Sequence, residues 1–194
     1  MTSWRRDRLS WTAAALLVFG GLAWAQSAAV PADLQAAILT RTLAYDRALK
    51  ARAGPAVVVG VLFKAGDKAS LASQEQMLKA LASVEPRSVH GLPIKVVSAA
   101  FKDRATLATW IEQEGIDAVY VTPGLGDELT TIRGACEERK VASLGAVRAF
   151  VEKGLAVGVV AKGETARLLV NLRAAEAAGM HLDPKLLQLS EVLR

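Results

Sequence analysis

Apolar and polar positions along the chain follow two different periods. Residues 56–63 and 118–122 are short, almost uninterrupted apolar runs rich in valine, which is typical of strands buried on both faces of a parallel sheet. Residues 70–84 and 103–114 instead repeat apolar side chains every three or four positions, which predicts helices. Because strands and helices alternate, the pattern predicts an α/β fold.

The predicted helices have recognisable ends. A long first helix is expected to open at Pro31 and Asp33 and to stop at Gly54 and Pro55. Its expected apolar positions are Leu34, Ala37, Ile38, Leu43, Ala44 and Ala48. Asp103 is expected to cap the helix that Gly115 ends, and Asp127 to cap the next helix, which runs to about Arg139.

The remaining pattern completes the fold. Short strands are expected at 94–98 and 141–144, and one helical turn near 146–151. Two further strands, 155–161 and 165–172, have the spacing of a hairpin. Helices are expected at 173–178, closed by Gly179, and at 182–193. The sequence therefore predicts one α/β domain of three layers, with a mostly parallel sheet and a C-terminal antiparallel hairpin as its edge.

The N-terminus has the three parts of a secretory signal peptide. Arg5, Arg6 and Arg8 form a basic region, residues 11–24 are uncharged, and Ala25 lies at the expected cleavage point. A retained anchor is the alternative, but a spanning helix needs roughly 20 apolar residues. We therefore expect a cleaved leader, residues 1–25, a mature domain, residues 26–194, and a location outside the cytoplasm.

The leader changes how composition is interpreted. Three of its arginines contribute to the formal net charge of +5, and its apolar run raises the mean hydropathy. No block of basic residues remains after it, so we expect no nucleic-acid partner. The adjacent Arg5 and Arg6 leave the choice between the general secretory and twin-arginine routes open.

Residues able to carry chemistry are few. His90 and His181 stand in no metal-ligand spacing, and each is expected in a surface loop. Nucleophile elbows, phosphate-binding loops and Cys-x-x-Cys pairs are missing. We therefore expect no catalytic residues, no metal and no cofactor. Cys136 is either a half-buried apolar residue, or a thiol that links two chains of a homodimer or acts in redox chemistry.

One edge of the sheet is the expected place for a ligand. Open α/β sheets bind ligands at the carboxyl ends of their strands, and the helix after the glycine-rich loop 122–126 could receive a small anion there. Glycine and proline also favour tight turns, so a purely structural role for this loop stays open. The candidate ligand-binding residues are Lys64, Ser98, Thr122, Gly124, Gly126, Asp127 and Ser143.

Four segments resemble the YfiR/HmsC-like periplasmic proteins. Residues 89–97, VHGLPIKVV, are similar to that family's V-N-G-R-P-V-x-V segment, and residues 154–160 to its G-G-x-I-x-F strand. Residues 118–122 match the position of its short apolar strand. The ending LLVNLRAAEAAGMHLDPKLL, residues 168–187, resembles I-N-x-x-A-A-x-x-A-G-L-x-I-S-S-x-L-L. Asn171 within it is expected to cap a helix.

The resemblance implies a regulatory role without catalysis. YfiR-like proteins restrain a membrane-bound diguanylate cyclase by contacting its periplasmic domain, and so control cyclic-di-GMP and biofilm formation. An inner-membrane cyclase or kinase is therefore the expected partner, through an exposed apolar patch. The alternative is a small-ligand-binding protein that resembles one lobe of a solute receptor, with a polar pocket at the strand ends. Tyr45 and Asp46 could form a partner surface or an internal pair.

Overall fold

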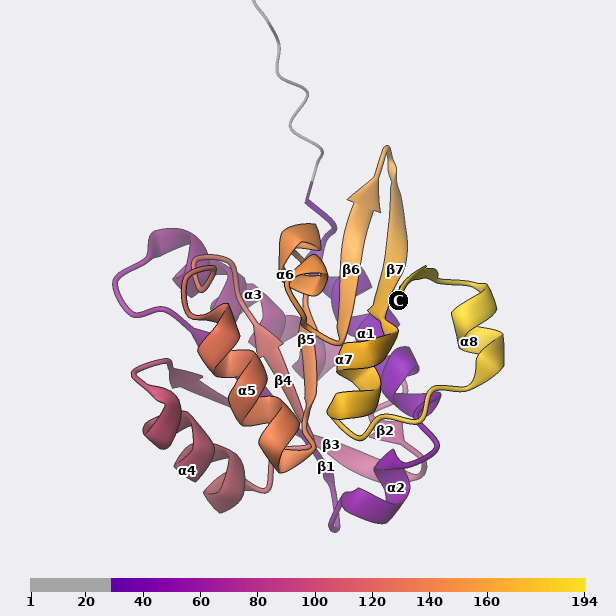
Figure 1. The fold of residues 1–194 in the computed structure, drawn as a ribbon, viewed down its shortest axis with the longest axis horizontal. Helices are drawn as coiled ribbons and strands as arrows, with labels where there is room; N and C mark the ends of the chain where they lie inside the picture. Colours follow the sequence, from indigo (N-terminus) through magenta and orange to yellow (C-terminus); the bar gives the residue numbers. More distant parts are fainter. Residues whose placement is uncertain (1–28) are drawn as a thin grey trace, which may run out of the picture.

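Eight strands form one sheet at the centre of the molecule (Figure 1). A computed structural model of the chain describes residues 29–194. The expected signal peptide, residues 1–25, lies outside the described residues. Along the sheet the strand order is β2-β3-β1-β4-β5-β6-β7-β8. Neighbouring strands are parallel from β3 to β6, whereas β2 with β3 and β6 with β7 are antiparallel, and β8 is parallel to β7.

The strands follow the apolar runs. Their bounds are β1 (Val57–Phe63), β2 (Ser88–Val89), β3 (Leu92–Ala100), β4 (Ala118–Val121), β5 (Ala142–Gly145), β6 (Val157–Lys162), β7 (Thr165–Asn171) and β8 (Glu191–Leu193). All residues of β4 and β5 are buried, as expected for strands covered by helices on both faces. The prediction of a mostly parallel α/β sheet with an antiparallel hairpin is confirmed.

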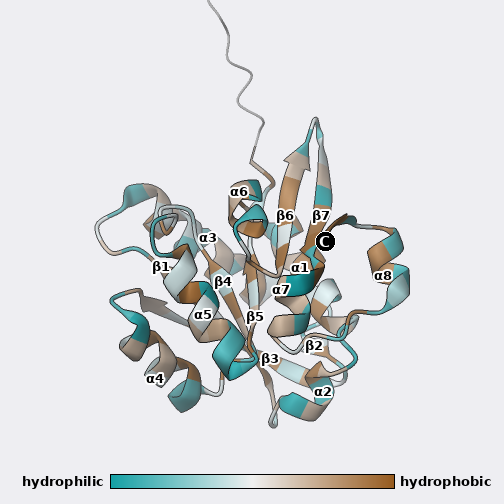
Figure 2. Ribbon diagram, viewed as in Figure 1, coloured by the Kyte–Doolittle hydropathy of each residue, from teal (hydrophilic) through white to brown (hydrophobic). Residues whose placement is uncertain are grey.

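Helices cover both faces of the sheet. Their bounds are α1 (Ala32–Ala44), α2 (Leu49–Arg52), α3 (Lys68–Ser83), α4 (Arg104–Glu114), α5 (Leu129–Arg139), α6 (Arg148–Glu152), α7 (Leu172–Ala177) and α8 (Pro184–Gln188). One core packs α1 and α3 against one face, and a second core packs α4, α5 and α6 against the other. Figure 2 shows apolar strands in the middle layer and polar surfaces on the outer helices.

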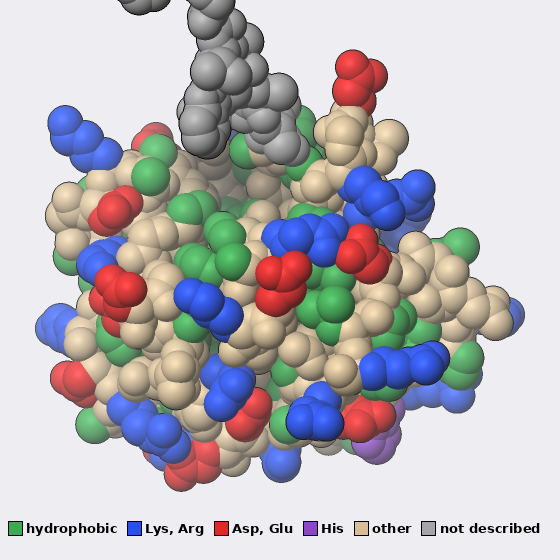
Figure 3. Space-filling model, turned by 45° about the horizontal axis from the view of Figure 1, so that its top comes forward, with side chains coloured by type: hydrophobic (Ala, Val, Ile, Leu, Met, Phe, Trp, Pro, Cys, Tyr) green, Lys and Arg blue, Asp and Glu red, His purple; other side chains and the backbone are tan. Residues whose placement is uncertain are grey.

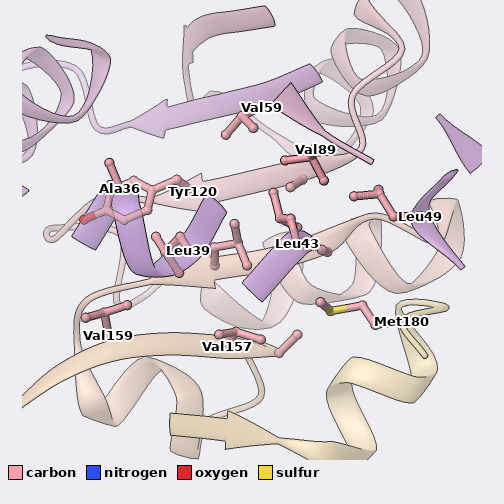
Figure 4. Packing of buried hydrophobic residues seen from close by; sticks show 14 of the residues in the cluster. Ala36, Leu39, Leu43, Leu49, Val59, Val89, Tyr120, Val157, Val159 and Met180 are labelled. Carbon is pink, nitrogen blue, oxygen red and sulfur yellow. The ribbon is translucent and has the colours of Figure 1, made fainter. Parts of the chain in front are cut away.

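Tyr120 of β4 anchors the core beneath α1. It is fully buried and its hydroxyl donates a hydrogen bond of 2.7 Å to the side chain of Gln35. Burial raises the pKa of Tyr120 to about 12. Ala36, Leu39 and Leu43 of α1 pack in the same cluster (Figure 4). A phenol therefore lies inside an apolar layer because its one polar atom is satisfied there.

Several helix boundaries agree with the sequence-based predictions. The Asp103 carboxylate accepts a hydrogen bond of 2.8 Å from Thr106 N, and Gly115 ends α4 in the left-handed conformation. Asn171 caps α7 by accepting from Ala174 N at 3.1 Å. Gly179, which follows α7, also has a positive φ. These boundaries depend on local hydrogen bonds and backbone conformations, so the sequence alone predicts them.

The prediction of a single long first helix was wrong. The chain leaves the helical path after Ala44 and resumes only at Leu49. Between the two helices, Asp46 is buried, pairs with Leu182 in an isolated bridge, and accepts hydrogen bonds from Ala48 N and His181 N. Contacts with the distant C-terminal segment therefore interrupt the helix.

The C-terminal segment also differs from the prediction. The expected helix at 182–193 is the short α8 followed by β8, which extends the sheet beyond β7. The hairpin is consequently not the edge of the sheet. Arg148 of α6 holds this last strand through two hydrogen bonds to Glu191, at 2.7 and 3.0 Å. Tertiary pairing thus outweighs the helical period of the local sequence.

Candidate functional site

Two loops that leave adjacent strands diverge at the carboxyl edge of the sheet. The loop after β1 leads to α3 on one face, and the loop after β4 leads to α5 on the other. β1 lies between β3 and β4. The connections that follow β1 and β4 therefore pass to opposite faces of the sheet, and open α/β sheets have a crevice between two such strand ends. Of the sequence-predicted site residues, Lys64, Thr122 and Gly124 come together here.

Hydrogen bonds close the floor of this crevice. The hydroxyls of Ser70 and Thr122, both buried, lie 2.6 Å apart. Ser70 Oγ also accepts from Lys64 N at 2.8 Å, and Thr122 Oγ1 donates to Leu62 O at 3.0 Å. These contacts use the two hydroxyls to join the loops to each other, so little hydrogen-bonding capacity remains for a ligand.

The carboxylate of Asp67 lies at the N-terminal end of α3, beside Gly124. Asp67 caps α3 by accepting a hydrogen bond of 2.8 Å from Ser70 N. Gly124 has φ of +92°, and a Cβ added there would lie 3.0 Å from the carboxylate carbon of Asp67. Glycine therefore lets the two loops approach. Because the helix end already holds a negative charge, it does not favour a bound anion.

An ion pair spans the same crevice. Lys64 Nζ lies 3.0 Å from Glu128 Oε1. The hydrogen bond to Glu128 raises the pKa of Lys64, and the charges of Asp127 and Asp67 act in the same direction. Asp127 itself is exposed and does not cap α5, which begins after Glu128 without a side-chain cap. The expected cap at Asp127 was wrong because the turn extends one residue further.

Three other candidate residues lie elsewhere. Ser98 is an exposed residue of β3, where Gln74 donates to its hydroxyl at 3.3 Å. Ser143 is buried within β5 and accepts a hydrogen bond of 2.9 Å from Ala156 N. A Cβ added to Gly126 would lie 3.5 Å from the ring of Phe150. Each of these residues has a structural contact of its own rather than a place in the crevice.

The two histidines lie close to Asp46. His90 is in a turn with φ of +54°, and its Nε2 lies 3.0 Å from Asp46 O. His181 is exposed, and its backbone N–H donates to the Asp46 carboxylate at 2.8 Å. Asp46 therefore belongs to an internal network, completed by Arg52 at 2.9 Å. Within residues 29–194, no cluster of three or more His, Cys, Asp or Glu side chains could hold a metal ion.

Cys136 is fully enclosed. Only 1% of its surface is exposed, and burial raises the pKa of its thiol to about 12. It packs in the core between α5 and the sheet. The expectation of a half-buried residue therefore understated its burial. In the folded protein the thiol cannot reach a second chain.

The outer side of α1 carries apolar side chains that the core does not cover. Leu34 is 44% exposed, Ala37 is exposed and Ile38 is half-buried. With Leu168 and Leu186, two buried core residues that form its floor, they line a hollow of about 180 Å³. Leu34 also lines a second hollow of about 180 Å³ beside the β6–β7 hairpin. We call Leu34, Ala37, Ile38, Leu168 and Leu186 the α1 surface.

The sequence contains the signal for the α1 surface. The stripe expected to face the core combines residues from two sides of the helix. Of the expected positions Leu43 is buried, whereas Leu34 and Ile38 face outward or to the rim. The buried side of the helix also contains Ala36 and Leu39, which the expected stripe did not include. A helix that is apolar on more than one side has a face left over for another contact. Two overlapping stripes at helical spacing could therefore have indicated this surface.

Charges on the carboxyl-edge side of the molecule are mixed. Figure 3 shows acidic and basic side chains interspersed over that side, with apolar side chains between them. Neither sign forms a continuous field there, as would suit a nucleic-acid backbone. Among the described helices, none has the length and apolar character needed to cross a bilayer.

Comparisons with known proteins identify one family. The family model described as YfiR/HmsC-like matches residues 32–191. No curated protein matches the sequence.

Solved structures with a similar fold are distant in sequence. They include a conserved domain protein from Vibrio cholerae (TM-score 0.61, 17% identity) and an ABC domain from Streptococcus pneumonia in complex with L-Trp (0.59, 14%); each match covers 84% of this chain and 60% of that one. A ligand-free, open substrate binding protein with adhesive properties from Clostridium difficile matches with a TM-score of 0.53 and 18% identity, covering 76% of this chain and 57% of that one. At such identities the likeness shows the α/β fold alone, and this chain spans about three fifths of their length.

Proposed function

The chain belongs to the YfiR/HmsC-like family, and from this membership we propose that it is a non-catalytic regulator in the periplasm. In this role it binds the periplasmic part of a membrane-bound diguanylate cyclase and restrains its activity. The expected leader, residues 1–25, supports export to that compartment. The protein would thereby lower cyclic-di-GMP and biofilm formation.

The α1 surface is the contact that we assign to the partner. An exposed apolar area rimmed by polar residues is typical of protein interaction sites. Arg41 lies at its rim on α1, and Glu164 lies at the hairpin next to it. Leu34 joins the two hollows, so one apolar segment of a partner could occupy both.

The carboxyl edge supports a ligand-binding role less well. Of its candidate residues, Thr122 is hydrogen-bonded, Lys64 is ion-paired, and Asp67 places a carboxylate where an anion would bind. A small anion there would have to displace internal contacts without gaining a free donor. We therefore rank partner binding above solute binding.

Affinity purification from membranes tests the proposal. Tagged protein, expressed as the full chain in the source cells, should recover a membrane protein with a diguanylate cyclase domain. Leu34→Asp should lower that recovery by about tenfold or more, because it buries a charge in an apolar contact. Cellular cyclic-di-GMP should rise correspondingly.

A matched substitution separates contact from general damage. Leu71 on α3 is 39% exposed and lines neither hollow, so Leu71→Asp should retain the partner. Recovery of no cyclase by the unaltered protein would contradict the proposed function. Equal loss in both variants would contradict the assignment of the α1 surface.

A further inference from the structure

A groove opens at the amino ends of the central strands, on the opposite edge of the sheet from the crevice. Its volume is about 600 Å³, within the usual range of roughly 300–1,000 Å³ for small-molecule sites. Apolar side chains from three elements form much of its wall: Val58 of β1, Ile111 of α4, and Val141 just before β5. Ile116 and Asp117, which precede β4, also line it.

Asp117 is a nearly buried carboxylate in this groove. It is 7% exposed. Its Oδ2 accepts a hydrogen bond of 2.8 Å from Val58 N, and the residues that the structure describes give its Oδ1 no such bond. Burial raises the pKa of this carboxyl group. A carboxylate held with one oxygen unpaired is stabilised by a donor, and most by a charged one.

Two helices direct their carboxyl ends toward the same groove. α4 ends at Glu114 and α5 ends at Arg139, and both terminal residues line the groove. In Figure 1 these ends lie beside the starts of β4 and β5, at the lower edge of the sheet. The carbonyl end of a helix carries partial negative charge and favours a cation. The helix ends and Asp117 therefore act in the same direction.

Four basic side chains line the groove and contact oxygens of the protein, although Arg139 Nε is buried without a hydrogen-bond partner. Arg52 donates to Asp46 at 2.9 Å and to Gly179 O at 2.5 Å. The remaining contacts are Lys95 Nζ with Glu114 at 3.0 Å, Lys140 Nζ with Ala177 O at 2.9 Å, and Arg139 with Glu112. A bound anion would have to compete with these oxygens for every donor except Arg139 Nε, whereas a cation meets the Asp117 Oδ1 oxygen, on which the Arg52 charge already acts, without a hydrogen bond.

We propose that this groove binds a small organic cation, an alkylamine or alkylguanidine. Its charged head contacts Asp117 Oδ1, and its aliphatic stem lies against Val58, Ile111 and Ile116. The stem gains from burial of apolar surface, while the head supplies the missing donor. This inference does not depend on the proposed regulatory function, because the groove and the α1 surface share no residue.

Calorimetry with two probes of equal length tests the site. Protein purified after expression of the full chain is titrated with pentylamine and, separately, with 1-pentanol. Pentylamine should bind about tenfold more tightly or better, because only the amine carries a charge for Asp117. Asp117→Asn should remove that difference while keeping an oxygen for Val58 N. Equal affinities for the two probes in the unaltered protein would overturn the proposal.

Two further variants complete the test. Glu75→Gln removes an exposed carboxylate on α3, outside the groove, and should leave pentylamine binding unchanged. Gly54 lines the groove and has open space around an added Cβ, so Gly54→Phe should fill the groove and weaken both probes about tenfold. If Asp117→Asn fails to fold by circular dichroism, Gly54→Phe decides the question. Unchanged pentylamine binding in Gly54→Phe would then contradict the site.

Discussion

At the scale of single residues, buried polar side chains hold neighbouring elements together through hydrogen bonds. Thr122 and Ser143 are buried and hydrogen-bonded to backbone or side-chain groups of other elements. Leaving such a partner unsatisfied costs about 1–3 kcal/mol. The sequence suggested both residues as ligand candidates because each is a polar residue near the end of a predicted strand. The sequence does not distinguish a hydroxyl that binds a ligand from one that joins two loops.

Cys136 should not react in the folded protein. Burial raises the pKa of its thiol to about 12 and excludes reagents, so the thiolate is scarce at pH 8. We expect iodoacetamide at pH 8 to label less than a few per cent of native protein and all of the protein in concentrated urea. Mass spectrometry measures the label. Rapid labelling without denaturant, or a disulfide-linked dimer on a non-reducing gel, would contradict the enclosed position.

At the scale of elements, the sequence predicted those whose stability is local or whose apolar run is long. β1 and β4 are uniform apolar runs, and α4 has both of its caps in the sequence. The prediction failed where long-range contacts decide, at the break after α1 and at β8. A three-residue strand has no periodicity to detect. The hydrogen bond that joins the two loops at the candidate site was not predicted either, because a contact between loops distant in sequence leaves no local pattern.

The Asp46 network is the clearest long-range contact between elements. Asp46→Ala removes acceptors for Ala48 N and His181 N and leaves Arg52 without its carboxylate. Breaking a buried pair in this way should lower the free energy of unfolding by about 3–5 kcal/mol. Urea denaturation followed by circular dichroism measures the change.

A neighbouring pair provides the control for that measurement. Arg47 and Asp183 join the same two segments at 2.6 Å, but the Arg47 side chain is 66% exposed. Arg47→Ala should therefore cost about 1 kcal/mol or less. Equal effects of Arg47→Ala and Asp46→Ala would show that burial of Asp46 contributes nothing.

At the scale of the whole molecule, the two edges of the sheet differ in character. Ion pairs and hydrogen bonds close the carboxyl edge, whereas the amino edge contains the groove with Asp117. The α1 surface lies apart from both on one helical layer. A regulator can thus carry a partner surface and a small-molecule site that do not overlap. Coupling between them would require two conformations that both sites distinguish.

Acid should destabilise the molecule below about pH 4.5. Hydrogen bonds lower the pKa of Asp103 and Asp183 below 3.8, and Arg148 lowers that of Glu191 below 4.5. The unfolded chain therefore binds more protons in this range, so stability is lost as pH falls. Asp117 opposes this trend, because burial raises its pKa.

A double variant isolates the two capping carboxylates. Asp103→Asn with Asp183→Asn keeps both cap acceptors but removes their titration. Its free energy of unfolding, measured by urea denaturation between pH 5 and pH 3, should fall less steeply than that of the unaltered protein. Glu164→Gln, at an exposed hairpin position, serves as the control and should follow the unaltered protein. Parallel curves for all three proteins would contradict the role of the caps.

The hydrogen bond between Asp46 and His181 also affects the order in which parts of the chain can fold during synthesis. Its two residues are 135 positions apart, and a ribosome makes the chain from the N-terminus onward. The segment after α1 cannot acquire its partner until nearly the whole polypeptide has been synthesised, because contacts this distant in sequence form late. Until then the Asp46 carboxylate stays accessible to chaperones. The segment that follows α1, although made early, is thus among the last parts of residues 29–194 to be secured.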